Sequence, residues 1–117
     1  MKPLTSQFLP LSPATLHIML ALASEDLHGY GIMREVARQS DGQYRIGSGT
    51  LYDNLQKLLD KGLVAENSKA NANDDPRRRY YRLTTLGRQV VAAEITRLED
   101  MFREAKLGLD GTRPQRA

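Results

Sequence analysis

The 117-residue sequence contains no cysteine and no tryptophan, and only 6% of its residues are aromatic. Without cysteine, disulfide bonds, thiolate metal sites and cysteine nucleophiles are excluded. No apolar stretch approaches the roughly 20 residues that span a bilayer, and the chain opens without a basic region leading into an apolar signal core. We therefore expect a cytoplasmic protein that has no membrane partner.

The charge of the chain is unevenly distributed, although its formal net value is only +3. Arg77, Arg78, Arg79 and Arg82 place four positive charges and no negative charge within six residues. Such a run indicates a polyanionic partner, while a merely solvated surface remains the alternative. With 40% hydrophobic residues, the chain has enough apolar material for one modest core, so we expect one globular unit.

The first part of the chain predicts an arm followed by a helix. Residues 1–11 carry two prolines and read as an arm without a helix of its own. Ser12 is a suitable N-cap, and Pro13 suits the first helical position because its missing amide proton would be unsatisfied there. The apolar stripe of this helix is Leu16, Met19, Leu20 and Ala23.

Two further helices follow, and the second of them has the clearest pattern. A helix from Tyr30 to Gln39 would turn Met33, Val36 and Ala37 inward and end at Asp41 and Gly42. The next helix would be capped by Ser48 and end at Gly62. Its leucines recur at i, i+4, i+7 and i+8, which is the spacing of one buried face: Leu51, Leu55, Leu58 and Leu59.

The remaining sequence predicts a hairpin and a long helix. Residues 63–68 and 80–83 read as two short strands. A helix starts near Thr84, and we expect the chain to fray from Gly108 onward. The apolar positions of this helix follow a heptad pattern: Val91, Ile95, Leu98, Phe102, Ala105 and Leu109. We refer to these six residues as the seam. An apolar seam of this kind packs against another helix. We expect that helix to belong to a second copy of the chain, which gives a homodimer. Packing within one chain is the alternative.

This element order predicts a mainly helical α+β fold. It corresponds to a winged helix-turn-helix with a two-stranded wing and a long C-terminal dimerisation helix. We divide the chain into a winged-helix DNA-binding domain with its N-terminal arm at residues 1–83, a dimerisation helix at 84–109 and a disordered tail at 110–117.

The helix that begins at residue 48 is the candidate recognition helix, because the second helix of such a pair enters the major groove. Centring its leucines on the core turns Thr50, Asp53, Gln56, Lys57 and Asp60 outward, with Tyr52 at the margin. Backbone amides at residues 48–50 would bind a phosphate, while Gln56 and Lys57 would contact base edges. Asp53 would be repelled by phosphates unless it accepts a bond from cytosine.

The wing supplies most of the positive charge. Its candidate contacts to phosphates or to a minor groove are Lys69, Arg77, Arg78 and Arg79.

The sequence resembles the PadR family of transcriptional regulators from about residue 16 to residue 98. Four segments carry the resemblance: His28-Gly29-Tyr30, Gly49-Thr50-Leu51-Tyr52 with Leu55 and Leu58, Gly62-Leu63-Val64, and Arg79 to Thr84 with Gly87. The resemblance implies that Ser48, Thr50 and Tyr52 touch DNA and that Tyr30 and the wing arginines contact its backbone. It also implies a promoter with two-fold symmetry and a C-terminal helix packed against the first helix, so that Leu16 and Leu20 join the seam in the dimer interface.

Two features depart from the family pattern. Many members have proline where this chain has Asp53, so the base preference is not carried over. The chain resembles the short branch with a single C-terminal helix, and it lacks the tryptophan with which some short members hold a flat aromatic effector. The effector therefore stays open.

The leading hypothesis is a homodimeric, sequence-specific transcriptional regulator, a repressor that a small molecule releases from double-stranded DNA. One alternative is a winged-helix adaptor that binds protein through Asp53 and Asp60. An enzyme would depend on Glu25, Asp26 and His28 as an acid and base group, which nothing else completes. We expect no catalytic residue and no cofactor, and His17 and His28 fit no common zinc spacing.

Overall fold

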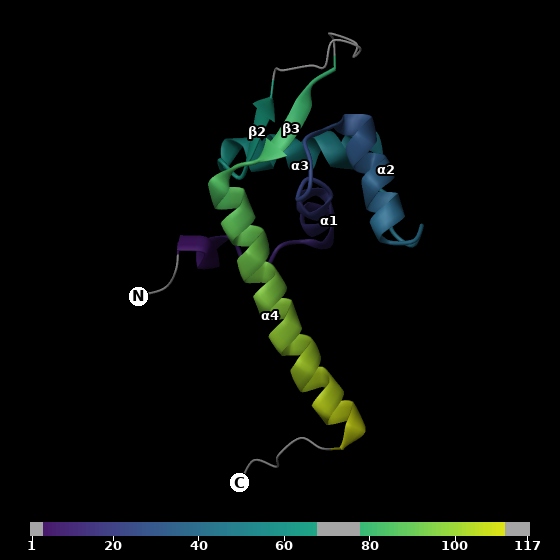
Figure 1. Cartoon of the computed structure of the whole chain (residues 1–117), viewed down its shortest axis with the longest axis vertical. Helices are drawn as coiled ribbons and strands as arrows, with labels where there is room; N and C mark the ends of the chain where they lie inside the picture. The colour runs from purple at the N-terminus through teal and green to yellow at the C-terminus, as the bar shows by residue number, and fades with distance from the viewer. Residues whose placement is uncertain (1–3, 68–77, 112–117) are drawn as a thin grey trace.

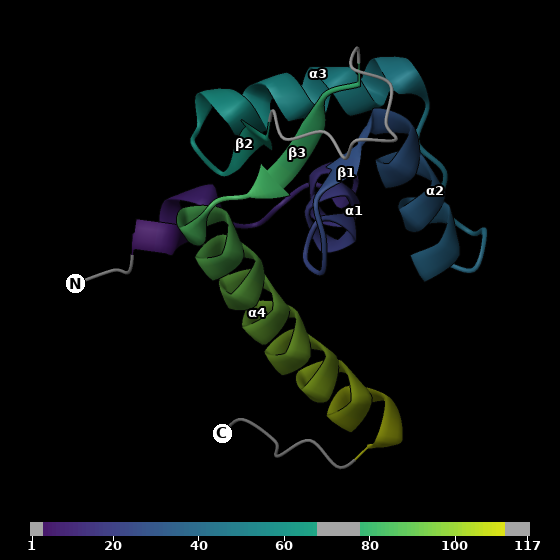
Figure 2. The same ribbon diagram turned by 45° about the horizontal axis from the view of Figure 1, so that its top comes forward.

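The computed structural model describes residues 4–67 and 78–111 of the chain. Its elements follow in the order η1 (a 3-10 helix, Leu4–Phe8), α1 (Pro13–Ala21), β1 (Leu27–His28), α2 (Gly29–Gln39), α3 (Ser48–Asp60), β2 (Val64–Asn67), β3 (Tyr80–Leu83) and α4 (Thr85–Asp110). Helices α1 to α3 and the sheet form a head, from which α4 extends as one long rod (Figure 1). The expected fold class is therefore confirmed. Helix α3 and the hairpin of β2 and β3 lie at the end of the molecule opposite to the free end of α4 (Figure 2).

A single hydrophobic core lies between the helices of the head and the sheet. Its buried members are Ile18, Met19, Ala21, Leu22, Ile32, Val36, Ile46, Leu51, Leu55, Leu58, Leu63, Val64, Tyr81, Leu83, Val90 and Val91. The last two belong to α4, so the first turns of α4 are part of the same core as the head. The boundary at residue 83, which we drew between the DNA-binding domain and the dimerisation helix, therefore does not separate two independent cores.

Helix α1 begins as expected. The Ser12 hydroxyl accepts a hydrogen bond from the Thr15 amide at 3.3 Å, and Pro13 occupies the first turn. The helix ends at Ala21, so the prediction that Ala23 continues its stripe is wrong. Ala23 lies beyond the helix and is exposed, because the chain turns there toward β1.

Helices α2 and α3 differ from expectation in detail. Helix α2 starts one residue earlier, at Gly29, and its buried side chains are Ile32 and Val36, whereas Met33 and Ala37 are only half-buried. In α3 the leucine pattern is confirmed, because Leu51, Leu55 and Leu58 are buried and Leu59 is half-buried.

The sheet has three antiparallel strands in the order β1-β3-β2. Strand β2 pairs with β3 in the register Val64 with Leu83, which buries both side chains toward the head. This pair is the predicted wing hairpin, although β2 begins at Val64 rather than at residue 63. The two-residue strand β1, on the other edge of β3, was not predicted.

The start of α4 is fastened to the end of α3. The Thr84 amide donates to the Leu63 carbonyl at 3.1 Å, and the Thr84 hydroxyl donates to the Gly62 carbonyl at 2.7 Å. That hydroxyl also accepts from the Gly87 amide at 3.0 Å and so caps α4. A Cβ at Gly87 would lie 2.0 Å from the Leu63 carbonyl oxygen, and this close approach of two backbones requires glycine.

The N-terminal segment packs against α4, which corrects the expectation of an arm without a helix. Residues Leu4–Phe8 form the 3-10 helix η1, and the Leu11 amide donates to the Glu94 carboxylate at 2.8 Å. Glu94 is only 1% exposed and also accepts hydrogen bonds from Arg97. The Arg97 guanidinium, with the Leu11 amide, holds the pKa of Glu94 below its usual value despite burial.

Helix α4 continues further than expected. It ends at Asp110, with Gly111 in the left-handed conformation that commonly closes a helix, so fraying does not begin at Gly108. Within the described ranges, no helix combines the length and the apolar character needed to cross a membrane.

Candidate nucleic-acid interface

The outward face of α3 is the face expected from the sequence. Its side chains are exposed: Thr50, Asp53, Gln56, Lys57 and Asp60. Opposite them, the leucines anchor the helix in the core, so the polar face is held on a rigid support. This face is available to a partner along its whole length.

The start of α3 is capped differently from the prediction. Gly47 is the N-cap and makes no side-chain cap bond, while Ser48 is the first helical residue. Ser48 therefore does not cap the helix. Nothing lies within 4 Å of an added Cβ at Gly47 or Gly49, so the approach to the backbone is open. Amide groups at a helix start carry partial positive charge and bind anionic oxygens.

The two candidate base-reading residues are each engaged with an acidic side chain one turn away. The Lys57 ammonium lies 3.5 Å from the Asp53 carboxylate, and the Gln56 amide donates to Asp60 at 3.0 Å. Asp53 thus has a partner on its own helix, which accounts for a carboxylate on this face. These contacts are exposed and worth only a few tenths of a kcal/mol, roughly, so a better partner displaces them.

The start of α2 lies directly against α3. A Cβ at Gly29 would come within 2.2 Å of the Tyr52 hydroxyl oxygen, so the absence of a side chain at Gly29 makes room for the Tyr52 ring. Tyr52 is 50% exposed, and Tyr30 at the next position of α2 is 62% exposed. Two tyrosines from neighbouring helices therefore reach the surface together.

His28 connects α2 to the wing, a role that the sequence analysis missed. Its Nδ1 accepts from the Gly31 amide at 3.1 Å and caps α2, while its Nε2 lies 3.3 Å from the Arg78 guanidinium. Its ring also meets the Tyr80 ring edge-on, with centroids 5.4 Å apart. Histidine is not among the usual N-cap residues Ser, Thr, Asp and Asn, so the residue type carried no signal for this role.

The acid and base group considered for an enzyme does not assemble. Glu25 and Asp26 are exposed, and Asp26 accepts a hydrogen bond from Asn67 at 2.6 Å, whereas His28 caps α2. Among the described residues, no three His, Cys, Asp or Glu side chains come together around a metal position.

Of the four basic wing candidates, Arg78 and Arg79 are described and exposed, whereas Lys69 and Arg77 lie outside the described residues. Arg79 lies 3.5 Å from the Glu66 carboxylate across the hairpin. Beneath the wing, Tyr81 is buried in the core, and burial, with Glu66 and Tyr52 nearby, raises the pKa of its phenol.

One pocket of about 290 Å³ joins these parts. It is lined by residues from α2, from α3 and from the base of the wing, among them Tyr30, Tyr52, Arg78 and Arg79. The structure thus brings together, on one side of the head, candidates that are up to 49 positions apart in the sequence.

The seam of α4 is only partly free. Val91 is buried in the core of its own chain, so the expectation that it faces a partner is wrong. Beyond it, Ile95, Phe102, Ala105 and Leu109 are exposed, and Leu98 is half-buried. Met101 on the same side of the helix is exposed as well. On α1, Leu16 and Leu20 are half-buried.

Comparisons with known proteins agree with this geometry. Residues 18–93 match the transcriptional regulator PadR-like family. Transcriptional regulator Rv3488 of Mycobacterium tuberculosis is 34% identical over 97 residues, covering 83% of this chain and 86% of the relative.

Solved structures share the fold. Bacillus subtilis PadR in complex with operator DNA matches with a TM-score of 0.62 at 21% identity, over 74% of this chain and 48% of that chain. Bordetella bronchiseptica BpsR, whose DNA binding is regulated by 6-hydroxynicotinic acid, also matches with a TM-score of 0.62, at 19% identity over 84% of this chain and 66% of that chain.

Proposed function

Because the chain belongs to the PadR-like family of transcriptional regulators, we propose that it is a homodimeric repressor that binds a specific promoter sequence. Its family and its curated relative are regulators of transcription and not enzymes. We place its action in the cytoplasm, where promoter DNA is accessible. No cofactor takes part in the proposed function.

The observation that carries the proposal is the gathering of α2, α3 and the wing on one side of the head. In this proposal α3 lies in the major groove, and its first amides hold a phosphate. The contacts come from Tyr30, Ser48, Thr50, Tyr52, Gln56, Lys57, Arg78 and Arg79. Lys69 and Arg77 also belong to the proposed set, although they lie outside the described residues. The B. subtilis relative with this fold binds operator DNA, which supports the same use of the fold here.

The uncovered part of the seam supports the homodimer. Phe102 is 55% exposed and Leu109 is 87% exposed, although both continue the face with which α4 enters its own core. An apolar stripe of this kind excludes water by pairing with an equivalent stripe. Packing against Leu16 and Leu20 of a second copy completes the interface that we propose. A two-fold dimer presents two recognition helices, so its operator is a palindrome.

We further propose that a small-molecule effector controls this repressor. It would bind between the two protomers and lower the affinity for DNA. Regulation of DNA binding by 6-hydroxynicotinic acid in the B. bronchiseptica protein supports the principle of such control on this fold. The absence of tryptophan means that an effector here would be held without an indole stack.

The test is binding to a duplex from the region upstream of the chain's own gene, measured from low to moderate salt. We expect the affinity to fall steeply with salt and to drop at least tenfold when Lys57→Ala and Arg78→Ala are combined. The control, Arg103→Ala with Lys106→Ala, removes the same charge from exposed positions of α4. Affinity that ignores salt, or that survives the first pair of substitutions, contradicts the proposal.

The same experiment distinguishes the repressor from the adaptor hypothesis. Asp53 and Asp60 contact Lys57 and Gln56 only through weak, exposed interactions, so these contacts leave the acidic side chains of α3 accessible to either kind of partner. An adaptor would bind this duplex and a random duplex equally weakly.

A further inference from the structure

A groove runs along the outer side of α2, between this helix and the loop that leads to α3. Its volume is about 610 Å³, and three of its lining side chains are arginines, Arg34, Arg38 and Arg45, against the single carboxylate of Asp41. We call it the flank groove. The sequence analysis did not identify these arginines, because they are spread along the chain and do not form a run of charge.

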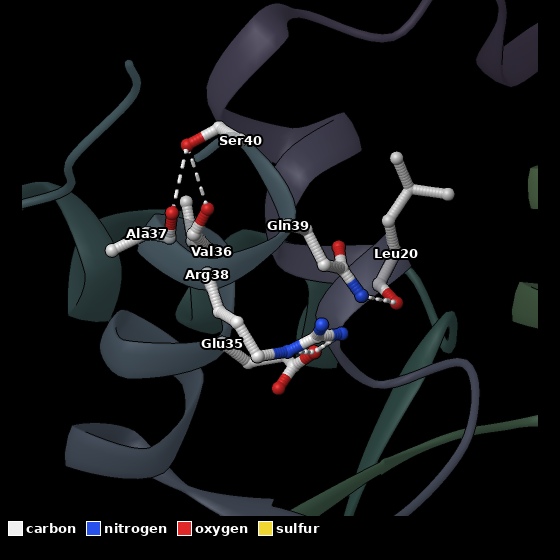
Figure 3. Close-up of polar contacts among 7 residues, drawn as sticks. All are labelled: Leu20, Glu35, Val36, Ala37, Arg38, Gln39 and Ser40. Atoms are coloured by element: carbon white, nitrogen blue, oxygen red, sulfur yellow. Dashed lines mark hydrogen bonds and ion pairs between the residues drawn. The ribbon is translucent and has the colours of Figure 1, made fainter. Parts of the chain in front are cut away.

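Among the described residues, two of the three arginines in the flank groove have no acidic partner. Arg38 donates two hydrogen bonds to Glu35 and is held there, as Figure 3 shows. Arg34 instead lies over the Tyr30 ring, with its guanidinium carbon 5.9 Å from the ring centre. Within residues 4–67 and 78–111, neither Arg34 nor Arg45 forms an ion pair, although Asp41 lines the same groove.

The flank groove adjoins the proposed DNA-binding face. Tyr30 lines both this groove and the pocket that joins α2, α3 and the wing. Arg45 stands two residues before Gly47, the N-cap of α3, and Arg34 follows Tyr30 by about one helical turn. The starts of α2 and α3 lie near each other on the side where the wing stands (Figure 2).

We propose that the flank groove binds the phosphate backbone of DNA next to the sequence that α3 reads, through Arg34 and Arg45. This inference rests on the proposed function. A guanidinium suits a phosphate because its fork of N–H groups matches two phosphate oxygens. The outward face of α3 offers little net charge, since Lys57 is paired with Asp53. Arg34 and Arg45 would therefore add positive charge beside α3 to that of the wing arginines.

The experiment compares Arg34→Ala, Arg45→Ala and the double variant with the unchanged protein. Binding is measured against salt on the upstream duplex and on a random duplex of equal length. We expect each single substitution to reduce the slope of log affinity against log salt by about 0.9, and the double substitution by about 1.8, on both duplexes. Both duplexes respond because phosphate contacts carry no sequence information.

Arg38→Ala is the matched control, since it removes an arginine of the same groove whose charge Glu35 already balances. We expect its slope to stay close to that of the unchanged protein. If the unchanged protein binds the upstream duplex with a steep slope and the double variant keeps that slope, the flank groove does not bind DNA. If the unchanged protein itself shows no salt-dependent binding, the proposed function fails first.

Discussion

At the scale of single residues, Glu94 is the side chain with the most unusual surroundings. Its carboxylate is buried where η1 and the chain after it cross α4, and it accepts hydrogen bonds from Leu11 and Arg97. These bonds favour the ionised form, and they lower the pKa of Glu94 relative to an unfolded chain. A carboxyl group with a lowered folded pKa adds stability above its unfolded pKa and loses it as the pH falls through the folded value.

We therefore predict that Glu94→Gln lowers the free energy of unfolding by about 1 kcal/mol at pH 6. Gln keeps an acceptor for Leu11 but loses the charge that holds Arg97. The difference from the unchanged protein shrinks as the pH falls below the ordinary glutamate pKa of 4.5, because the unchanged protein then loses the same contribution. Urea denaturation at pH 6 and at pH 3.5 measures both values.

Glu99→Gln serves as the control for this prediction. Glu99 is exposed on the same helix, and the described part of the chain gives it no ion pair. Its substitution should change the free energy of unfolding by less than about 0.5 kcal/mol. An equal loss for Glu94→Gln at both pH values would mean that the ionised carboxylate does not account for the stability at this position.

The exposure of single residues was easier to predict from the sequence than their contacts. The exposure of Thr50 and Lys57 followed from periodicity alone. The bond from Lys57 to Asp53 did not, because an i,i+4 pair competes with solvent and with other rotamers. His28 was considered as an acid or base and is instead the cap of α2, a role that depends on ring orientation.

At the scale of elements, α4 combines two environments on one face. Val90 and Val91 are buried in the head, whereas Ile95 and Phe102 emerge from it with the same apolar character. The heptad pattern revealed this face but could not tell where the head ends, because burial by the same chain and burial by a partner look identical in sequence. Val91 was assigned to the partner for that reason.

We predict that Phe102→Glu converts the proposed dimer into a monomer without unfolding the chain. The substitution places a charge in the centre of the exposed seam, while the side chain touches nothing in the core of its own head. Sedimentation equilibrium measures the mass, and circular dichroism checks the helix content. Thr96→Glu adds the same charge on the opposite face of α4 and should leave the mass unchanged. A Phe102→Glu protein of unchanged mass would refute the proposed interface.

The short elements were the ones that escaped prediction. Strand β1 has two residues, too few for an alternating pattern to appear, and it exists because β3 offers a free edge. The helix η1 follows a methionine, a lysine and a proline and has no amphipathic period, so it depends on its contact with α4. By contrast, α3 was predicted almost to the residue because four leucines mark its buried side.

At the scale of the whole molecule, the head and α4 give an elongated protomer of 62 × 37 × 23 Å. A dimer joined along α4 would therefore hold two heads apart and present two copies of α3 to DNA. Binding of the second head is then intramolecular, which commonly raises the affinity by about 10² to 10⁴.

We predict that the unchanged protein binds a duplex with two inverted half-sites at least 100-fold more tightly than a duplex with one. Phe102→Glu should abolish this preference while leaving the affinity for a single half-site within about threefold, because α4 extends away from the part of the head that carries α3 (Figure 1). Fluorescence anisotropy with the two duplexes measures both affinities. A preference that persists in the Phe102→Glu protein would show that the seam does not link the heads.

The junction at Thr84 makes each protomer a lever. Because Thr84 and Gly87 are fastened to Gly62 and Leu63, the end of α3 and the start of α4 cannot turn independently. The 26 residues of α4 form an arm of about 39 Å. A tilt of about 5° at its far end would displace the head by roughly 3 Å, enough to change the spacing of the two recognition helices. In the proposed dimer, a small molecule bound between the two copies of α4 would thus control DNA binding without touching α3.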